Sequence, residues 1–250
     1  GMLRLLKSTR LDSTQHDYLH HAEDAIVSLL GLINDLLDVT RIEAGRIELH
    51  ESDIRLDLLV HDVLQVLQPQ ASKRQMQLRM QVPEHVFFKA DRERLRQVLF
   101  NLTGNALKFT EAGSVEVQAE LLEQEARIRF AIRDTGIGIS HADQLRIFER
   151  FAQADSSRSR NYEGAGLGLF ISNQLIQCMG GQLQLQSEPG QGSTFFFEIP
   201  YVPGDRTEEE RALEPEDLVG GQLEGKRILL CEDNKVNQLY IQQLLRQYHV

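Results

Sequence analysis

The chain has 250 residues, 41% of them hydrophobic and 26% charged, which is ordinary for a soluble globular protein. A formal net charge of −10 excludes a broad nucleic-acid or anionic-membrane surface, because such surfaces need clustered Lys and Arg. The two cysteines, Cys178 and Cys231, are isolated in the sequence, which fits a reducing cytoplasmic compartment without a disulfide framework or a zinc site. No run approaches the ~18 apolar residues that a membrane span needs.

A long helix with a heptad seam is the first predicted element. Its apolar residues recur at alternating spacings of four and three: Tyr18, Ala22, Ala25, Leu29, Leu32, Leu36 and Val39. Ile26, Ile33 and Leu37 widen this stripe, so we expect a four-helix bundle that a second chain completes. Thr14 with Asp17 predicts a capping box at the start of the helix, and Gly45 predicts its end. Residues 1–45 therefore read as a dimerising helical hairpin that is truncated at its start.

From residue 46 to residue 202 the pattern predicts an α+β two-layer sandwich, because the strands cluster and the helices lie between them. Strands are expected at Arg46–His50, Gln77–Val82, Val86–Ala90, Ser114–Leu121, Ala126–Arg133, Gln182–Ser187 and Thr194–Ile199. Helices are expected at Ile54–Leu67, Arg92–Lys108 and Leu167–Met179. Asp91 is the expected N-cap of the second of these helices.

Two further segments follow the sandwich. Residues 203–224 are rich in Glu, Asp, Gly and Pro, which predicts a solvated acidic linker. Residues 225–250 contain one strand and one helix, which cannot bury a core of their own. Because both ends interrupt recognisable units, we expect the sequence to be a fragment of a longer chain.

Two amides and a lysine share one face of the predicted helix Arg92–Lys108. Asn101 and Asn105 are four residues apart, and Lys108 follows one turn later. Amide oxygens are acceptable ligands for Mg²⁺, which keeps waters and substrate phosphates as its other ligands, and a nearby lysine neutralises phosphate charge. Taken alone, the same pattern fits a polar helix face equally well.

An Asp-Thr-Gly-Ile-Gly sequence directly follows the predicted strand Ala126–Arg133. A buried Asp134 could accept a hydrogen bond from an adenine amino group, while Gly136 and Gly138 would let the backbone approach the ring closely. The alternative is a turn from strand to loop that the Asp side chain caps.

A glycine run, Gly164, Gly166 and Gly168, opens the predicted helix Leu167–Met179. Backbone N–H groups at a helix N-terminus form a site for phosphates, although no strand leads directly into this run, so it is not a Rossmann fingerprint. Residues 152–163 before it are polar and carry Arg158 and Arg160, as a lid over phosphates would. An ordinary exposed loop is the alternative.

Together these motifs resemble the ordered boxes of the histidine-kinase ATPase domain. The boxes correspond here to Asn101–Thr110, Asp134–Gly138, Phe148 with Phe151, Gly164–Gly168, and Gly192-Ser193-x-Phe195. Residues 32–45 also resemble the end of the second helix of that family's dimerisation domain, so the resemblance covers residues 1–202.

The resemblance implies a role for each motif. Asn105 would hold Mg²⁺ with Asn101 assisting, Lys108 would contact phosphate, and Asp134 would hold the adenine. Gly164–Gly168 would form the lid hinge and the phosphate cradle. The implied catalytic residues are Asn101 and Lys108, and the implied residues that bind ATP and Mg²⁺ are Asn105, Lys108, Asp134, Gly136, Gly138, Phe148, Arg158, Arg160, Gly164, Gly166, Gly168 and Ser193.

One contrast within the wider ATPase family favours phosphoryl transfer. The ATPases of type II topoisomerases, Hsp90 and mismatch repair typically have a water-activating Glu where Asn101 stands, and an amide cannot act as a general base. The implied activity is therefore ATP-dependent phosphorylation of a histidine, followed by transfer to a receiver Asp. The alternative is a nucleotide-binding, dimerising module that has lost phosphotransfer and works by conformation.

The residues that would accept the phosphoryl group are not recognisable. The accepting histidine of this family lies in a His-Glu-x-x-x-Pro setting, which does not occur here. His16 before Asp17 is the nearest imitation, and His20 and His21 lie further along the same helix. Arg227–Asn237 resembles the opening of a receiver domain, in which Glu232 and Asp233 would form an acidic Mg²⁺ pocket. The expected partners are a second copy of the chain and a receiver, in cis or separate, with a membrane only through other segments.

Overall fold

The computed structural model describes residues 6, 9, 11–44, 47–151 and 166–206. All of them except Arg206 belong to the first of two compact units, residues 1–205. The predicted receiver start (225–250) and the predicted linker beyond residue 206 lie outside the described residues. The same holds for Gly45, Arg158, Arg160 and Gly164.

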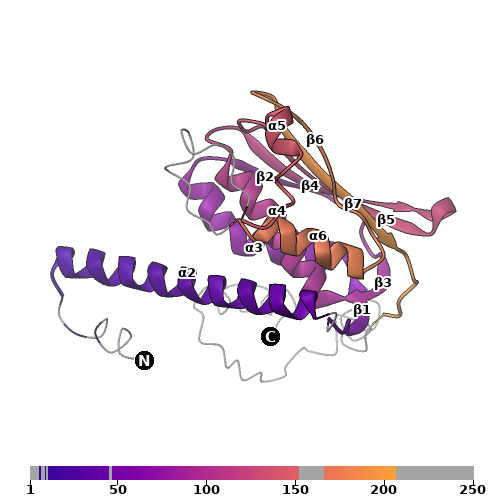
Figure 1. Ribbon diagram of the computed structural model, residues 1–250, viewed down its shortest axis with the longest axis horizontal. Coiled ribbons are helices and arrows are strands. Elements are labelled where there is room, and N and C mark those ends of the chain that lie inside the picture. Colours follow the sequence, from indigo (N-terminus) through magenta and orange to yellow (C-terminus); the bar gives the residue numbers. More distant parts are fainter. Residues whose placement is uncertain (1–5, 7–8, 10, 45–46, 152–165, 207–250) are drawn as a thin grey trace, which may run out of the picture. The chain divides into compact units, whose positions relative to one another are not determined.

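One long helix, α2 (Ser13–Glu43), precedes the sandwich (Figure 1). Its N-cap is Asp12, whose Oδ1 accepts from the Gln15 N–H at 2.8 Å while the Asp12 N–H donates to Gln15 Oε1 at 3.0 Å. The capping box predicted at Thr14 and Asp17 is therefore wrong. Asp12 with Gln15 three residues on satisfies both exposed N–H groups reciprocally, so the helix begins earlier.

The last turns of α2 are joined to the sandwich by a polar cluster. The buried Asp38 carboxylate accepts from Arg94 Nη1 at 3.1 Å and from Gln97 Nε2 at 2.8 Å. Arg94 and Gln97 both belong to α4 (Arg92–Lys108). Each oxygen of Asp38 thus accepts a hydrogen bond from one of two residues that lie three positions apart on the same face of α4.

A two-stranded sheet follows α2 in the chain. Strand β1 (Glu51–Arg55) pairs antiparallel with β3 (Phe87–Asp91), and Ile54 lies opposite Phe88 with both side chains fully buried. The strand predicted at Arg46–His50 is wrong, because no strand forms over residues 47–50. Long-range pairing of Ile54 with Phe88 selects the strand, and the local alternation of residues 46–50 does not reveal it.

The chain returns to this small sheet after its last strand. The Lys89 N–H donates to the Val202 carbonyl at 2.9 Å, and the Gly204 N–H donates to the Phe87 carbonyl at 3.1 Å. Asp53 of β1 accepts from the Asp205 N–H at 2.9 Å. The entry into the sandwich and the exit from it are therefore both bonded to the β1–β3 sheet.

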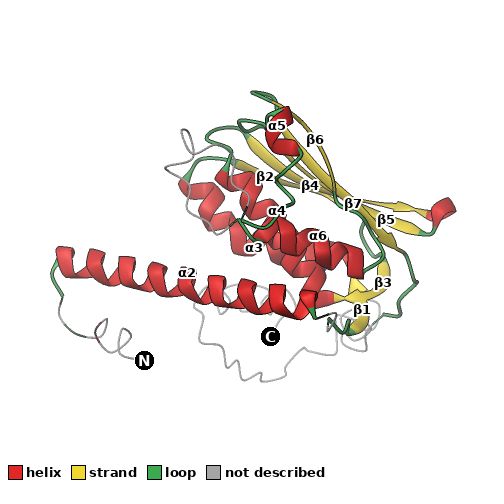
Figure 2. Ribbon diagram, viewed as in Figure 1, coloured by secondary structure: helices red, strands yellow, loops and turns green. Residues whose placement is uncertain are grey.

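The main sheet has five strands in the order β2-β4-β5-β7-β6, with β2 and β4 parallel and the other pairs antiparallel. Helices α3, α4 and α6 lie together and cover one face of the sheet (Figure 2). This arrangement confirms the predicted α+β two-layer sandwich. The elements are α3 (Leu56–Lys73), β2 (Gln77–Gln81), β4 (Ser114–Leu122), η1 (Glu123–Glu125), β5 (Arg127–Asp134), α5 (His141–Gln144), α6 (Gly168–Cys178), β6 (Gln184–Glu188) and β7 (Gly192–Pro200).

Alternation along the strands builds the core between the two layers. Alternate residues of β4 and β5 are buried, most of β7 is buried, and the Phe130 and Phe197 rings stack with centroids 5.0 Å apart. Helix α4 has the predicted bounds, and its N-cap Asp91 accepts from the Arg94 N–H at 3.0 Å. Helix α3 runs past Pro69, which sits on an exposed position where water can satisfy the carbonyl that the proline leaves unpaired.

Candidate functional site

Three polar residues lie at the C-terminal end of α4, as the sequence predicts. Asn101 is half-buried, and its Nδ2 donates to Ser172 Oγ on α6 at 2.8 Å. Asn105 is also half-buried, and its side chain has no hydrogen-bond partner among the described residues. The Lys108 ammonium lies 5.1 Å from the centroid of the Phe109 ring. One amide is thus held by the protein, while the other remains available to a ligand.

The start of α6 packs against Asn101. A Cβ on Gly168, the first residue of α6, would lie 2.5 Å from Asn101 Oδ1, so no larger side chain fits there without a shift. The side chain of the N-cap Leu167 provides no hydrogen bond to the first N–H groups of the helix. Gly166, at a φ of +69°, directly precedes Leu167. The end of the glycine run and the first amide therefore lie together.

Asp134, at the end of β5, is buried with 6% of its surface exposed. Its Oδ1 accepts from the Gly136 N–H at 2.8 Å and from the Ser193 N–H at 3.2 Å. Its Oδ2 has no partner among the described residues. Within that part of the chain, Thr103 Oγ1 is the only side-chain oxygen or nitrogen that is both fully buried and unpaired. Oδ2 therefore keeps some access to solvent. Burial raises the pKa of the Asp134 carboxyl, and the two N–H donors oppose that rise only in part.

The loop after Asp134 is bonded to the end of α4. The Ile137 N–H donates to the Phe109 carbonyl at 3.2 Å, and the Phe109 N–H donates to the Asn105 carbonyl at 3.0 Å. A Cβ on Gly136 would collide with the same Phe109 carbonyl, so glycine is required for this contact. The carboxylate of Asp134 and the amides of α4 thus belong to one site.

The turn between β6 and β7 closes the other side of that loop. The Gly190 N–H donates to the Ile137 carbonyl at 2.7 Å. Gly138, at a φ of +65°, packs on the Glu188 carbonyl, and Gly192, at a φ of +91°, packs on the Asp134 carbonyl. Side chains at either position would strain the backbone as well as collide with it.

The structure brings most of the predicted site residues together. Asn101, Asn105, Lys108, Asp134, Gly136, Gly138, Gly166, Gly168 and Ser193 lie on the contacts described above, although their roles in binding stay predictions. Phe148 is half-buried against the core, and Phe151 is exposed with a φ of +57°. The predicted lid residues Arg158 and Arg160, with Gly164, lie outside the described residues.

Sequence reasoning missed three polar residues at the site. Ser172 lies one turn into α6 and binds Asn101. Ser187 and Gln144 bind the loop after Asp134: Ile139 N–H donates to Ser187 Oγ at 2.8 Å, and Gln144 Nε2 donates to the carbonyls of Ile139 and Ser187 at 2.8 and 2.9 Å. No signal in the sequence marks them, because each is a common polar residue with at least one partner that is distant along the chain.

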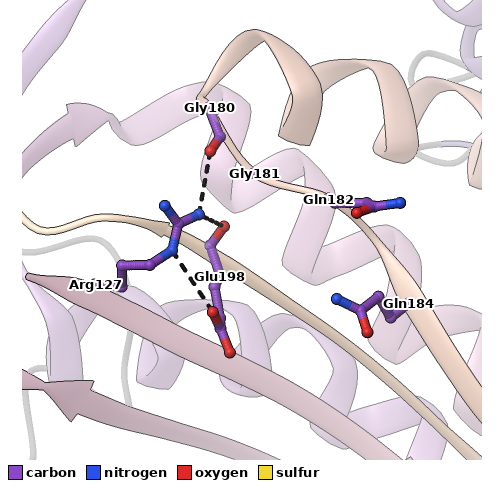
Figure 3. A pocket seen from close by; sticks show the side chains of 6 residues that line it. All are labelled: Arg127, Gly180, Gly181, Gln182, Gln184 and Glu198. Carbon is purple, nitrogen blue, oxygen red and sulfur yellow. Dashed lines mark hydrogen bonds and ion pairs between the residues drawn. The ribbon is translucent and has the colours of Figure 1, made fainter. Parts of the chain in front are cut away.

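A hollow of about 330 Å³ lies away from this site, at the turn from α6 to β6, and none of the predicted site residues line it (Figure 3). Its basic group, Arg127, donates to the Gly180 carbonyl at 3.1 Å and to the Glu198 carbonyl at 2.9 Å. The Arg127 Nε also lies 3.6 Å from Glu198 Oε2. Arg127 thus links the end of α6 to β7. Because its charge is paired with that of Glu198, this hollow is not suited to bind a charged ligand.

Within the described ranges, no cluster of three His, Cys, Asp or Glu side chains could bind a metal ion. The donor set nevertheless fits Mg²⁺ with a nucleotide, because that ion needs only one or two protein oxygens beside phosphates and waters, and Asn105 offers one. None of the helices that the structure describes combines the length and apolarity needed to cross a bilayer.

Comparison with known families agrees with this geometry. Residues 90–203 match the model of the histidine kinase-, DNA gyrase B- and HSP90-like ATPases. Residues 1–45 match the His Kinase A (phospho-acceptor) domain. The first match contains every element that builds the site, from α4 to β7, and the second contains α2.

Relatives and solved structures extend this likeness over nearly the whole chain. The sensory/regulatory protein RpfC of Xanthomonas campestris pv. campestris is 35% identical over 98% of this chain, and the sensor histidine kinase GacS of Pseudomonas protegens is 38% identical over 98%. This chain spans only 38% and 26% of those two proteins.

Full-length ShkA in complex with AMPPNP matches with a TM-score of 0.69 and 33% identity over 99% of this chain and 50% of that one. The catalytic domain of the histidine kinase ThkA matches with a TM-score of 0.54 and 27% identity over 62% of this chain and 99% of that one. The chain therefore belongs to the hybrid sensor histidine kinases and carries their ATP-binding domain of the histidine kinase, gyrase and HSP90 type.

Proposed function

We propose that this chain is the kinase core of a two-component phosphorelay, which binds Mg²⁺-ATP and passes the γ-phosphoryl group to a histidine and then to a receiver Asp. The observation that carries the proposal is the joining of two half-sites. The hydrogen bond from Ile137 to the Phe109 carbonyl connects the Asp134 loop with the end of α4, where the Asn105 side chain has no partner among the residues that the structure describes. One half-site suits a base, and the other suits phosphates.

The base would bind at Asp134. Its Oδ1 is occupied by two backbone N–H groups, so Oδ2 is the atom that can accept a hydrogen bond from the amino group of adenine. The glycine contacts of this loop bring the backbone close enough to line the flat face of a purine. An acceptor that is both charged and buried favours a base with an exocyclic amino group at this position.

The phosphates would lie between α4 and the start of α6. The N–H groups at the start of α6, which the Leu167 side chain does not cap, and the Lys108 ammonium both attract negative charge. Mg²⁺, when bound to Asn105, would neutralise charge on the phosphates. The chain's own groups then position the nucleotide and hold the developing charge, which is most of what phosphoryl transfer requires.

The chemistry at Asn101 favours transfer over hydrolysis. Its amide is oriented by Ser172 and cannot take a proton from water, so the site lacks the general base that an ATPase would place there. The alternative of a nucleotide-binding module that acts only by conformation is not favoured, because its relatives GacS and BarA are named as histidine kinases.

We further propose that the chain works as a homodimer through α2. Its large apolar side chains are exposed in the single chain, with Leu29 at 57%, Leu32 at 43% and Leu36 at 54%. A stripe of this kind needs neighbouring helices to cover it. A receiver in cis or a separate response regulator would be the next partner, and the ThkA structure with its response regulator TrrA offers a precedent. The expected compartment of the kinase core is the cytoplasm.

Incubation with γ-labelled ATP tests the activity. We expect Mg²⁺-dependent ATP binding by the chain, and acid-labile label on an added histidine phospho-acceptor domain from a relative. Asn105→Ala should abolish both signals, while Asn34→Ala on exposed α2 should preserve them. Release of phosphate without labelled protein would instead identify a stand-alone ATPase and refute the proposal. Acid-labile label on this chain alone would place an acceptor within it, with His16 as the first candidate.

A further inference from the structure

A second layer of polar contacts lies behind Asp134, and it involves residues from three separate segments. Ser187 lies near the end of β6, Ile139 follows the glycines of the Asp134 loop, and Gly192 with Ser193 begins β7. Ser187 is half-buried, whereas Gly192 and Ser193 are buried. The Ser187 hydroxyl contacts both of the other segments at once.

The hydrogen bonds of this hydroxyl fill its whole bonding capacity. Ser187 Oγ accepts from the Ile139 N–H at 2.8 Å and donates to the Gly192 carbonyl at 3.0 Å. Its remaining contact is with Ser193 Oγ at 3.0 Å, which can donate to it. A hydroxyl offers one donor and two acceptor positions, so these three bonds satisfy it completely.

The Gly192 carbonyl belongs to the same peptide group as the Ser193 N–H. In a trans peptide these two groups point in opposite directions. Ser187 binds the carbonyl side of this peptide, and Asp134 Oδ1 binds its N–H side at 3.2 Å. Gly192 has a φ of +91°, where a glycine permits rotation that another residue would resist. The Ser187 bond therefore helps to hold this peptide plane in place, together with the pairing of β6 with β7.

We propose that Ser187 is a positioning residue for the base: by fixing the Gly192–Ser193 peptide, it keeps the Ser193 N–H on Asp134 Oδ1 as the second donor beside Gly136 and so presents Oδ2 to the amino group of adenine. This inference rests on the proposed function of Asp134 and extends it to a residue that does not touch the nucleotide. Gln144 supports the arrangement, because its amide binds the carbonyls of both Ile139 and Ser187.

Comparing the binding of two nucleotides separates a positioning role of Ser187 from a role in stability. ATP carries the 6-amino group, and purine riboside triphosphate lacks it but has the same ring, sugar and phosphates. The ratio of the two dissociation constants therefore reports the Asp134 contact alone. If Ser187 acted only in folding, its loss would weaken the binding of both nucleotides equally and leave the ratio of their dissociation constants unchanged.

We expect the wild-type chain to bind ATP at least about tenfold more tightly than purine riboside triphosphate, as one hydrogen bond to a buried charge implies. Ser187→Ala should reduce this ratio to about threefold or less. Ser187→Thr, which keeps the hydroxyl, should restore it. Ser52→Ala, on the exposed side of β1, should leave it unchanged. Isothermal titration with both nucleotides provides the dissociation constants.

Two results would overturn the inference. A wild-type ratio in Ser187→Ala would show that Asp134 is positioned without the hydroxyl, while the proposed ATP binding would stand. A wild-type chain that binds neither nucleotide would remove the proposed function and this inference together. If Ser187→Ala does not fold, Gln144→Ala tests the same network, and an unchanged ratio in that variant would also refute it.

Discussion

Replacing Asp134 with Asn tests the base site and the energetics of its burial together. Asn has nearly the same shape, so its Oδ1 can still accept from Gly136 and Ser193. The atom at the Oδ2 position becomes an NH₂ group, which opposes the amino group of adenine with a second donor. Losing a hydrogen bond to a charged acceptor costs about 1.5–3 kcal/mol, which corresponds to a roughly 10- to 150-fold weaker affinity for ATP.

The same substitution should not destabilise the nucleotide-free chain. Burial raises the pKa of Asp134 above its usual 3.8, so the folded state retains the proton to a higher pH than the unfolded state does. Stability therefore falls as the pH rises from 3.8 through the raised pKa, and the ionised carboxylate is unfavourable at pH 7. Asn carries no such penalty. We expect the melting temperature of Asp134→Asn at pH 7 to equal or exceed that of the wild type.

Calorimetry measures both quantities, by titration with ATP and by thermal unfolding without it. Asp62→Asn is the matched control, because Asp62 pairs with Arg92 at an exposed position and should affect neither affinity nor stability by much. ATP affinity within twofold of the wild type in Asp134→Asn would show that the carboxylate does not bind the base. A clear drop in the melting temperature would refute the reasoning about burial.

Four further substitutions test other contacts. Gly168→Ala should displace the Asn101 amide and lower the free energy of unfolding in urea by about 1–3 kcal/mol, whereas Gly104→Ala, with nothing near its Cβ, should stabilise α4 by about 0.5–1 kcal/mol. Asp38→Ala should speed hydrogen exchange in the last turns of α2 and lower stability by about 1–2 kcal/mol, and unchanged exchange would deny that this cluster holds the helix end. Leu36→Glu should convert the expected dimer to monomers in light scattering, and a dimer that persists would place the interface elsewhere.

The sequence was informative where local chemistry decides the structure. Helix α4 has the predicted bounds, because Asp91 caps its start and the apolar spacing continues to Lys108. The glycines were also informative: at Gly136, Gly138 and Gly168 a Cβ would meet a backbone or amide oxygen, so their presence marked the close contacts of the site.

Other features depend on partners that are far apart in the chain. Strand β1 forms where Ile54 meets Phe88, and nothing within residues 46–55 reveals that pairing. The parallel pairing of β2 with β4 also depends on the sheet as a whole. Ser187 had no motif to mark it, because its hydroxyl binds the Gly192–Ser193 peptide and does not touch the predicted nucleotide itself.

Residues 202–204, which leave the ATPase domain, are bonded to β3, and this brings the two ends of the domain close together. Its first strand, β1, and the segment around Val202 lie on either side of β3, which places entry and exit roughly 10 Å apart, or two strand spacings. Chain ends that lie this close allow a domain to be inserted or replaced, provided that the bonds of Asp38 to Arg94 and Gln97 of α4 are kept. A homologous ATPase domain cut at the same two strands should therefore fit between α2 and the C-terminal segment, so that kinases of this type can be recombined at these boundaries.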